Sequence, residues 1–185
     1  FGQRSMPYDK VVHLYRRALY QSFSSFGMNR QGQVVGSNWG SYPATNRIWN
    51  KDMYYASLPF TMFEPELCQK TVLWFDQYGV KFPGSKFTGG INHSLSNSLS
   101  SALLASLYFE HTGDTKFFER YPQVLLNASR IIEDILAQRR SGEPMLFPSV
   151  WLSDAFALGK YHTGSNLCLW KACSGLAEIF EVLEQ

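Results

Sequence analysis

The sequence predicts an all-α protein made of antiparallel helical hairpins. Apolar residues recur at helical spacing in about six segments, residues that start or stop helices flank those segments, and no segment alternates apolar and polar residues as a strand does. At 185 residues the chain has the length of one domain, which we place over residues 1–185.

The first half of the chain contains three predicted helices. The first spans residues 9–26, with Asp9 at its start, and buries a stripe of Val11, Tyr15, Ala18, Leu19, Ser22, Phe23 and Phe26. After a loop rich in Gly, Ser and Asn, a short helix begins near Asp52, runs through Tyr55 and Leu58, and tolerates Pro59 or kinks there. The third helix begins at Pro65 and ends before Gly79.

The second half repeats this plan. A helix rich in small residues covers 93–111 and ends at Gly113, and Asp114 caps the next helix. That helix has the cleanest apolar period of the sequence: Tyr121, Val124, Leu125, Ala128, Ile131, Ile132 and Ile135. The last helix spans 165–183 and is expected to bury Leu169, Cys173, Leu176, Ala177 and Phe180.

The predicted helices alternate in character. The first, third and fifth are amphipathic, whereas the second, fourth and sixth are apolar or small-residue-rich nearly all round, as enclosed helices are. A long, aromatic-rich loop precedes each enclosed helix, and antiparallel hairpins bring such loops to the same end of a bundle. We therefore expect Asp52, Asn92 and Asp154 at one end of the domain, which is the candidate site.

Composition excludes several classes of protein. A net charge of +2 without a basic block argues against nucleic acid and anionic membranes as partners, and no apolar run reaches the roughly 18–20 residues that span a bilayer. We therefore expect a soluble protein, cytoplasmic or secreted. Three cysteines are too few for a disulfide scaffold and lack the CxxC spacing of a zinc site, and we expect no metal or cofactor. Because the chain begins at Phe1, it reads as a processed product or an excised piece.

Three segments carry a family resemblance. They are the stretch NRIWNKDMYYASLP (46–59), the helix from Asn97 to Asp114, and the pair WLSDA (151–155) and TGSNLCLWKA (163–172). In this order, they resemble motifs of the six-hairpin (α/α)6-barrel glycosidases. The pattern is most similar to that of the glycogen-debranching amylo-α-1,6-glucosidases and, more loosely, the glucoamylases. The resemblance implies that the hairpins form about half of an (α/α)6 toroid, because a full toroid needs about twelve helices.

The resemblance also implies a function, which is hydrolysis of an α-glucosidic bond in an oligo- or polysaccharide, with inversion. Asp154 stands where debranching enzymes keep their general acid, and Asp52 stands where the family contacts sugar hydroxyls. Glycoside hydrolysis needs one protonated carboxyl at the leaving oxygen and a second carboxylate, about 6.5–9.5 Å away in inverting enzymes. The second carboxylate normally comes from the later half of the barrel. We therefore expect a C-terminal continuation or a partner chain to complete it.

Residue chemistry adds candidates for sugar binding, each with a structural alternative. Indole rings in loops can stack on sugars and polar loop side chains can bind hydroxyls, which gives Trp39, Trp49, Trp151, Asn92, His93 and His162. Asp52 could equally be an acidic residue that stabilises the first turn of a helix, and Asp154 could be a solvated acid on a surface loop. The two histidines could be loop residues or helix caps. Trp74 and Trp170 lie in helical stripes and are expected in the core.

Two other classes of function remain open at this point. One is a non-catalytic, carbohydrate-binding toroid that has lost its acid and base. The other is a different α/α-toroid enzyme, namely a sugar epimerase or a terpenoid cyclase. Epimerases of this kind use several histidines, and cyclases favour Asp-rich motifs such as DxDD, which the sequence lacks. Activity on aryl α-glycosides separates an enzyme from a binding protein.

Overall fold

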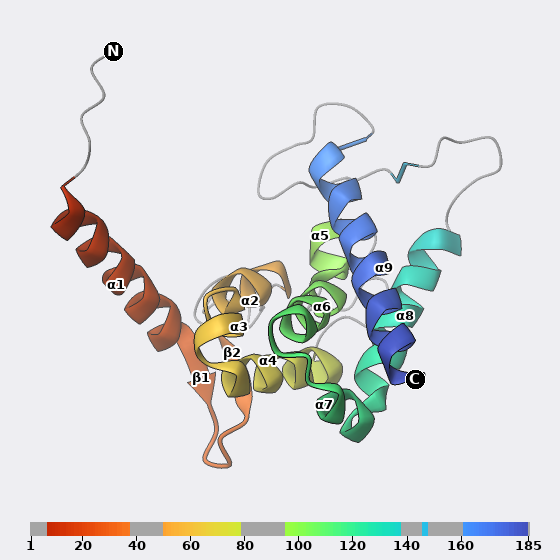
Figure 1. Cartoon of the computed structure of the whole chain (residues 1–185), viewed down its shortest axis with the longest axis horizontal. Coiled ribbons are helices and arrows are strands. Elements are labelled where there is room, and N and C mark those ends of the chain that lie inside the picture. The colour runs from red at the N-terminus through yellow and green to blue at the C-terminus, as the bar shows by residue number, and fades with distance from the viewer. Residues whose placement is uncertain (1–6, 38–49, 79–94, 138–145, 148–160, 185) are drawn as a thin grey trace, which may run out of the picture.

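The computed structural model describes residues 7–37, 50–78, 95–137, 146–147 and 161–184. These residues form nine helices and one two-stranded sheet, so the fold is all-α apart from a single hairpin (Figure 1). The elements in chain order are α1 (Tyr8–Ser25), β1 (Phe26–Met28), β2 (Val34–Ser37), α2 (Asn50–Ser57), α3 (Phe60–Phe63), α4 (Pro65–Tyr78), α5 (Leu95–Ser98), α6 (Ser100–Thr112), α7 (Thr115–Arg120), α8 (Pro122–Ala137) and α9 (Thr163–Leu183).

The β-hairpin corrects the expectation that the chain has no strand. β1 pairs antiparallel with β2, with Phe26 opposite Ser37 and Met28 opposite Val34. Phe26, which was expected on the first helix, is therefore in a strand. The turn is stabilised by Asn29, whose Oδ1 accepts hydrogen bonds from the backbone N–H of Gln31 (3.0 Å) and Gln33 (2.9 Å). Strands this short contain too few residues to show an alternating pattern.

Several predicted helix boundaries are confirmed. α4 begins at Pro65, as expected, and Gly113 ends α6 in the left-handed region (φ 61°). Asp114 is the N-cap of α7, and its Oδ1 accepts a hydrogen bond of 3.2 Å from the Phe117 backbone N–H. Asp9 lies in the first turn of α1, but Pro7 occupies the N-cap position, so its predicted capping role is wrong.

Three predicted helices are interrupted. The residues after Pro59 form a separate helix, α3, and a turn at Leu99 divides the helix predicted over 93–111 into α5 and α6. The helix predicted after Asp114 is divided at Tyr121 into α7 and α8. Tyr121 leaves the helical region (φ −127°, ψ 59°) because the following Pro122 disfavours helical dihedrals at the residue before it.

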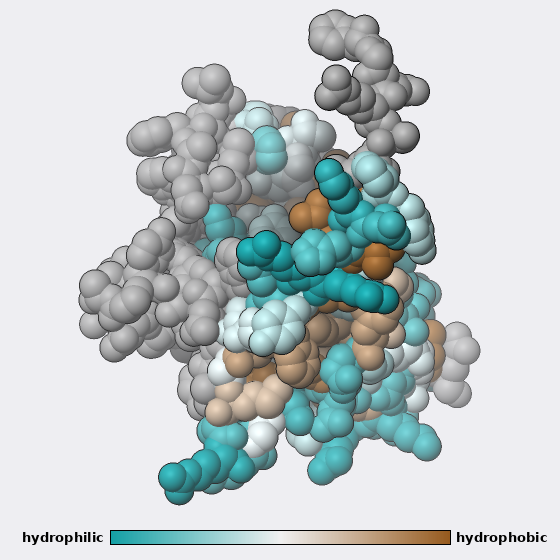
Figure 2. Space-filling view, turned by 90° about the vertical axis from the view of Figure 1, so that its left-hand side faces the viewer, coloured by the Kyte–Doolittle hydropathy of each residue, from teal (hydrophilic) through white to brown (hydrophobic). Residues whose placement is uncertain are grey.

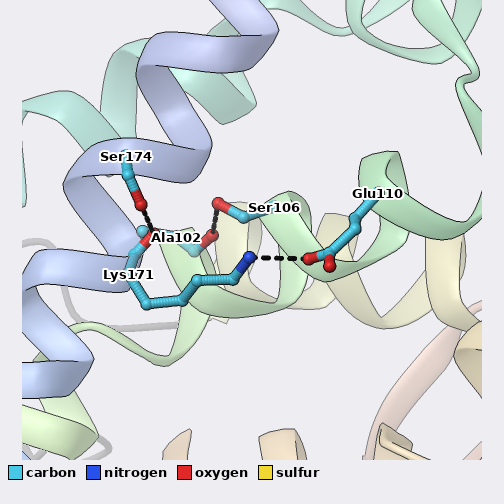
Figure 3. A network of polar contacts seen from close by, with 5 residues as sticks. All are labelled: Ala102, Ser106, Glu110, Lys171 and Ser174. Atoms are coloured by element: carbon cyan, nitrogen blue, oxygen red, sulfur yellow. Dashed lines mark hydrogen bonds and ion pairs between the residues drawn. The ribbon is translucent and has the colours of Figure 1, made fainter.

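α6 is the centre of the core. Eight of its residues are buried, and it packs against α2, α4, α8 and α9. Its contact with α9 is especially close, because a Cβ atom added at Gly175 would lie 2.4 Å from the Cβ of Ser106. Figure 3 shows this interface, where Lys171 Nζ of α9 lies 2.7 Å from Glu110 Oε2 of α6. The prediction that this helix is enclosed is confirmed.

The buried face of α9 differs from the predicted one. Leu169 and Leu176 are buried as expected, but Ala177 is exposed and Cys173 is only partly buried. The face is turned towards Ala172, Gly175 and Ile179, because α6 packs directly against Gly175. Leu167, Trp170 and Val182 are exposed, so α9 is not enclosed all round.

α1 projects from the rest of the molecule (Figure 1). It packs against α2 and β1, and its Phe23 ring lies edge-on to that of Phe60 in α3, with the centroids 5.9 Å apart. Ser25 is its one buried residue. Val11, Tyr15 and Phe23, which were expected to be buried, are each about half exposed, because the contacts of α1 cover only a part of its apolar stripe. Figure 2, which views the molecule from the side of α1, shows hydrophobic side chains open to solvent among hydrophilic ones.

None of the described helices is both long enough and apolar enough to cross a lipid bilayer.

Candidate functional site

A pocket of about 380 Å³ lies at the start of α9. Its walls combine aliphatic, aromatic and neutral polar side chains, contributed by the first two turns of α9 and by two short segments before it. The lining residues are Leu146, Phe147, Tyr161, His162, Thr163, Asn166, Leu167, Leu169 and Trp170.

His162 lines this pocket and is the N-cap of α9. Its Nδ1 accepts a hydrogen bond of 3.1 Å from the Ser165 backbone N–H and lies 3.1 Å from Ser165 Oγ. With Nδ1 accepting, the neutral ring carries its proton on Nε2. Gly164 makes this position possible, because a Cβ atom there would lie 2.9 Å from His162 Cε1. The cap alternative for His162 is therefore confirmed, and Nε2 is left as a possible donor to a ligand.

Asn166 fixes one wall of the pocket. Its Oδ1 accepts from the Phe147 backbone N–H (2.8 Å), and its Nδ2 donates to the carbonyl oxygens of Phe147 (3.0 Å) and His162 (3.0 Å). One side chain therefore satisfies both backbone polar groups of Phe147. Sequence reasoning noted Asn166 only within a motif. An Asn in the first turn of a helix after a long loop is the signal for such a clamp.

Trp170 corrects a sequence prediction. It was expected in the core together with Trp74, but it is 66% exposed, whereas Trp74 is 2% exposed. Trp170 shares a face of α9 with Thr163, Asn166 and Leu167, which is the spacing of one helical face. This face is turned away from α6, and Trp170 therefore presents an open aromatic surface beside the pocket.

Asp52 lies in the first turn of α2, where its structural alternative placed it. The neighbouring Lys51 backbone N–H donates a hydrogen bond of 2.8 Å to Oδ1 of the buried Asn97, which ties the start of α2 to α5. Partial burial, with further contributions from Cys168 and Asp52, raises the pKa of the Tyr55 hydroxyl. Burial and the same cysteine raise the pKa of Tyr54.

These interactions bring the starts of three helices together. α5 packs against both α2 and α9, and Cys168 of α9 lies close enough to the two tyrosines of α2 to contribute to their raised pKa values. Tyr55 is 57% exposed, with its ring centroid 5.5 Å from that of Tyr54. Sequence reasoning missed this aromatic pair, because Tyr55 was placed only as part of a helix.

Six of the predicted site residues lie outside the described residues: Trp39, Trp49, Asn92, His93, Trp151 and Asp154. The expectation that Asp52, Asn92 and Asp154 share one end of the domain therefore stays a prediction. Asp52 and His162 are described, and the elements that hold them, α2 and α9, both contact α5.

None of the described residues that line the pocket is an Asp, Glu, Lys or Arg. Within the described part of the chain, no group of three His, Cys, Asp or Glu side chains could hold a metal ion. The described groups can stack on a ligand and donate hydrogen bonds to it.

A scan of protein-family models finds none that matches this chain, and no curated protein matches it.

Proposed function

We propose that this chain belongs to a glycoside hydrolase and binds its carbohydrate substrate where α2, α5 and α9 begin. One observation carries the proposal. Phe147 and Tyr161, two walls of the 380 Å³ pocket, are the residues that immediately flank 148–160, the segment that contains Trp151 and Asp154. The segment that contains the proposed general acid therefore begins and ends next to residues of a pocket that suits a sugar.

The chemistry of the pocket supports a neutral sugar. A volume of about 380 Å³ falls within the usual range of small-molecule sites. The exposed ring of Trp170 offers an apolar face for sugar C–H groups, and the Thr163 hydroxyl and His162 Nε2 can bind hydroxyl oxygens. The described lining residues provide no carboxylate, ammonium or guanidinium group as a counter-charge for a strongly ionic ligand.

The proposed reaction is acid-assisted hydrolysis of an α-glucosidic bond. The Asp154 carboxyl donates its proton to the glycosidic oxygen as the bond to the anomeric carbon breaks. A second carboxylate removes a proton from the attacking water, and the product has an inverted anomeric centre. Asp52 binds a hydroxyl in the first subsite. We propose that further helices of an (α/α)6 toroid supply the second carboxylate and cover the exposed apolar face of α1.

Turnover by the wild-type protein and by Asp154→Asn on aryl α-glucosides tests the catalytic part. General-acid assistance contributes roughly 10²–10⁴-fold, and we expect a loss of that order for poor leaving groups and a smaller loss for good ones. A uniform loss, or none, contradicts the role of Asp154.

Binding of malto-oligosaccharides, measured by calorimetry, tests the site itself. We expect Trp170→Ala to weaken binding roughly tenfold, since stacking on an aromatic ring contributes about 1 kcal/mol or more. The matched control is Tyr20→Ala, which removes another exposed ring, on α1. Unchanged affinity for Trp170→Ala contradicts this site. Binding without turnover in the wild type favours the alternative, a non-catalytic carbohydrate-binding toroid.

A further inference from the structure

We propose a second carbohydrate site, in a groove between the β1–β2 turn, α4 and the turn that joins α7 to α8. The groove has a volume of about 230 Å³. We call it the amide groove, because three glutamine side chains line it together with one lysine and two aromatic rings. The residues that matter to the argument are Gln31, Gln33, Lys70, Trp74, Gln77 and Tyr121.

One wall of the amide groove is the β1–β2 turn, which Asn29 holds in a fixed shape. Asn29 Oδ1 accepts from the backbone N–H of Gln31 and Gln33, and the Gly32 backbone N–H donates to the Asn29 carbonyl oxygen (3.0 Å). Asn29 Nδ2 also donates to Gln33 Oε1 at 2.7 Å. This bond fixes the orientation of the Gln33 amide and leaves its Nε2 as a donor for a ligand.

The opposite wall is one face of α4. Lys70, Trp74 and Gln77 follow the spacing of a single helical face, and Gln77 is exposed. Lys70 Nζ lies 2.8 Å from Glu66 Oε1. It is also 4.0 Å from the position of a Cβ atom added at Gly32, whose φ of 74° favours glycine. The turn and the lysine therefore approach each other closely at the groove.

The chemistry of these groups selects a neutral, hydroxyl-rich ligand. A primary amide carries a donor and an acceptor side by side, which matches two adjacent hydroxyl groups of a sugar ring. The charge of Lys70 is balanced by Glu66, so the lysine donates hydrogen bonds without leaving a net positive site. Trp74 is only 2% exposed and lies behind the groove, so the half-buried Leu73 and Tyr121 provide the apolar surface for sugar C–H groups.

The amide groove is separate from the pocket at the start of α9. In Figure 1 the β1–β2 turn lies at the lower edge of the molecule, while α9 begins near the upper edge. Among the described residues, none lines both sites. Binding at the amide groove therefore does not depend on the proposed hydrolysis or on the proposed substrate pocket.

The test is titration of ¹⁵N-labelled protein with four neutral oligosaccharides: maltoheptaose, cellohexaose, xylohexaose and mannohexaose. We expect at least one of them to shift the side-chain amide signals of Gln31, Gln33 and Gln77. Gln33→Ala and Gln77→Ala should each weaken this binding roughly three- to tenfold, the usual effect of losing one neutral hydrogen bond. Gln123→Ala, which removes an exposed amide on α8, is the matched control and should change nothing.

The outcomes separate the two sites. Shifts at the groove that persist in Trp170→Ala support the proposal, even if the α9 pocket binds no sugar. The proposal is wrong if none of the four oligosaccharides shifts the groove signals, or if the shifts are confined to residues around Trp170. It is also wrong if only oligomers of an acidic sugar bind there, because that result requires a charged site.

Discussion

α1 and α6 show how differently two helices of one chain can be placed. α1 has an apolar stripe along one face, yet only Ser25 is buried in its 18 residues. α6 has apolar or small residues on almost every side, and eight of its 13 residues are buried. An apolar pattern therefore tells which face of a helix can be buried, whereas the neighbouring elements decide whether it is buried.

The neighbours account for the contrast. α2, α4, α8 and α9 surround α6, and its small side chains, such as Ala102, Ala105 and Ser106, let them approach closely. α1 packs less extensively, against α2 and β1 and, through Phe23 near its C-terminal end, against Phe60 of α3. We expect substitutions in α6 to change the free energy of unfolding strongly and equivalent substitutions in α1 to change it little.

The largest expected difference comes from removing one leucine side chain from each helix. Leu104 of α6 is 0% exposed, whereas Leu14 of α1 is 52% exposed. Leu104→Ala should lower the free energy of unfolding by about 2–5 kcal/mol, because it removes buried methyl groups and leaves a cavity. Leu14→Ala should change it by less than about 0.5 kcal/mol. Urea denaturation of both variants measures the difference, and similar losses would show that α1 is also packed.

The contact between α6 and α9 gives the next largest effect. Gly175→Ala should lower the free energy of unfolding by about 1–3 kcal/mol, because the added Cβ would meet Ser106 Cβ and Oγ at 2.4 Å. Ser106→Gly removes those atoms, so the double variant should be less destabilised than the sum of the two single variants. Strict additivity in a double-mutant cycle would mean that the two helices do not touch at this point.

A pH dependence distinguishes a buried tyrosine of α6 from an exposed one of α1. Burial, with a hydrogen bond that the hydroxyl donates to Asp114 Oδ2 (2.6 Å), raises the pKa of Tyr108 to about 12. The native state therefore keeps this proton longer than the unfolded chain. The stability that results is complete below about pH 10 and is lost as the pH rises to about 12.

Tyr108→Phe should therefore reduce the fall in the free energy of unfolding between pH 10 and pH 12, measured by urea denaturation at each pH. Tyr20→Phe, on α1, is the matched control, since Tyr20 is 73% exposed. An unchanged pH profile for Tyr108→Phe would show that its hydroxyl is equally easy to ionise in the folded and unfolded states.

The smallest effect is expected on the exposed stripe of α1. Tyr15 is 51% exposed, so Tyr15→Lys should change the free energy of unfolding by no more than about 0.5 kcal/mol. Denaturation at two protein concentrations is the measurement. A loss that grows with protein concentration would show that another molecule covers this face.

The sequence predicted most of the helices because their signals are local. Pro65, Gly113 and Asp114 mark helix ends through backbone geometry and capping, and these need no knowledge of the rest of the fold. The breaks at Leu99 and Tyr121 were missed because the apolar period runs through them. The outward position of α1 was missed for another reason: its stripe has the same pattern whether or not another helix lies over it.

The candidate site was less predictable. His162 as a cap follows from its place before a helix, but the exposure of Trp170 depends on how α9 is rotated against α6. That rotation is set by the close contact at Gly175, far from the site along the helix. The pairing of Asn166 with Phe147 is a contact between a helix and a residue in the preceding connection, and no periodic pattern marks it.

The three hydrogen bonds of Asn166 also act as a crosslink between parts of the chain that are distant in sequence. They join the first turn of α9 to Phe147, which lies 19 residues earlier. Because Phe147 and α9 are both walls of the pocket, the pocket keeps its shape only while this crosslink holds. Asn166→Ala removes the acceptor of the Phe147 backbone N–H, so this amide should exchange its hydrogen with solvent faster through local opening.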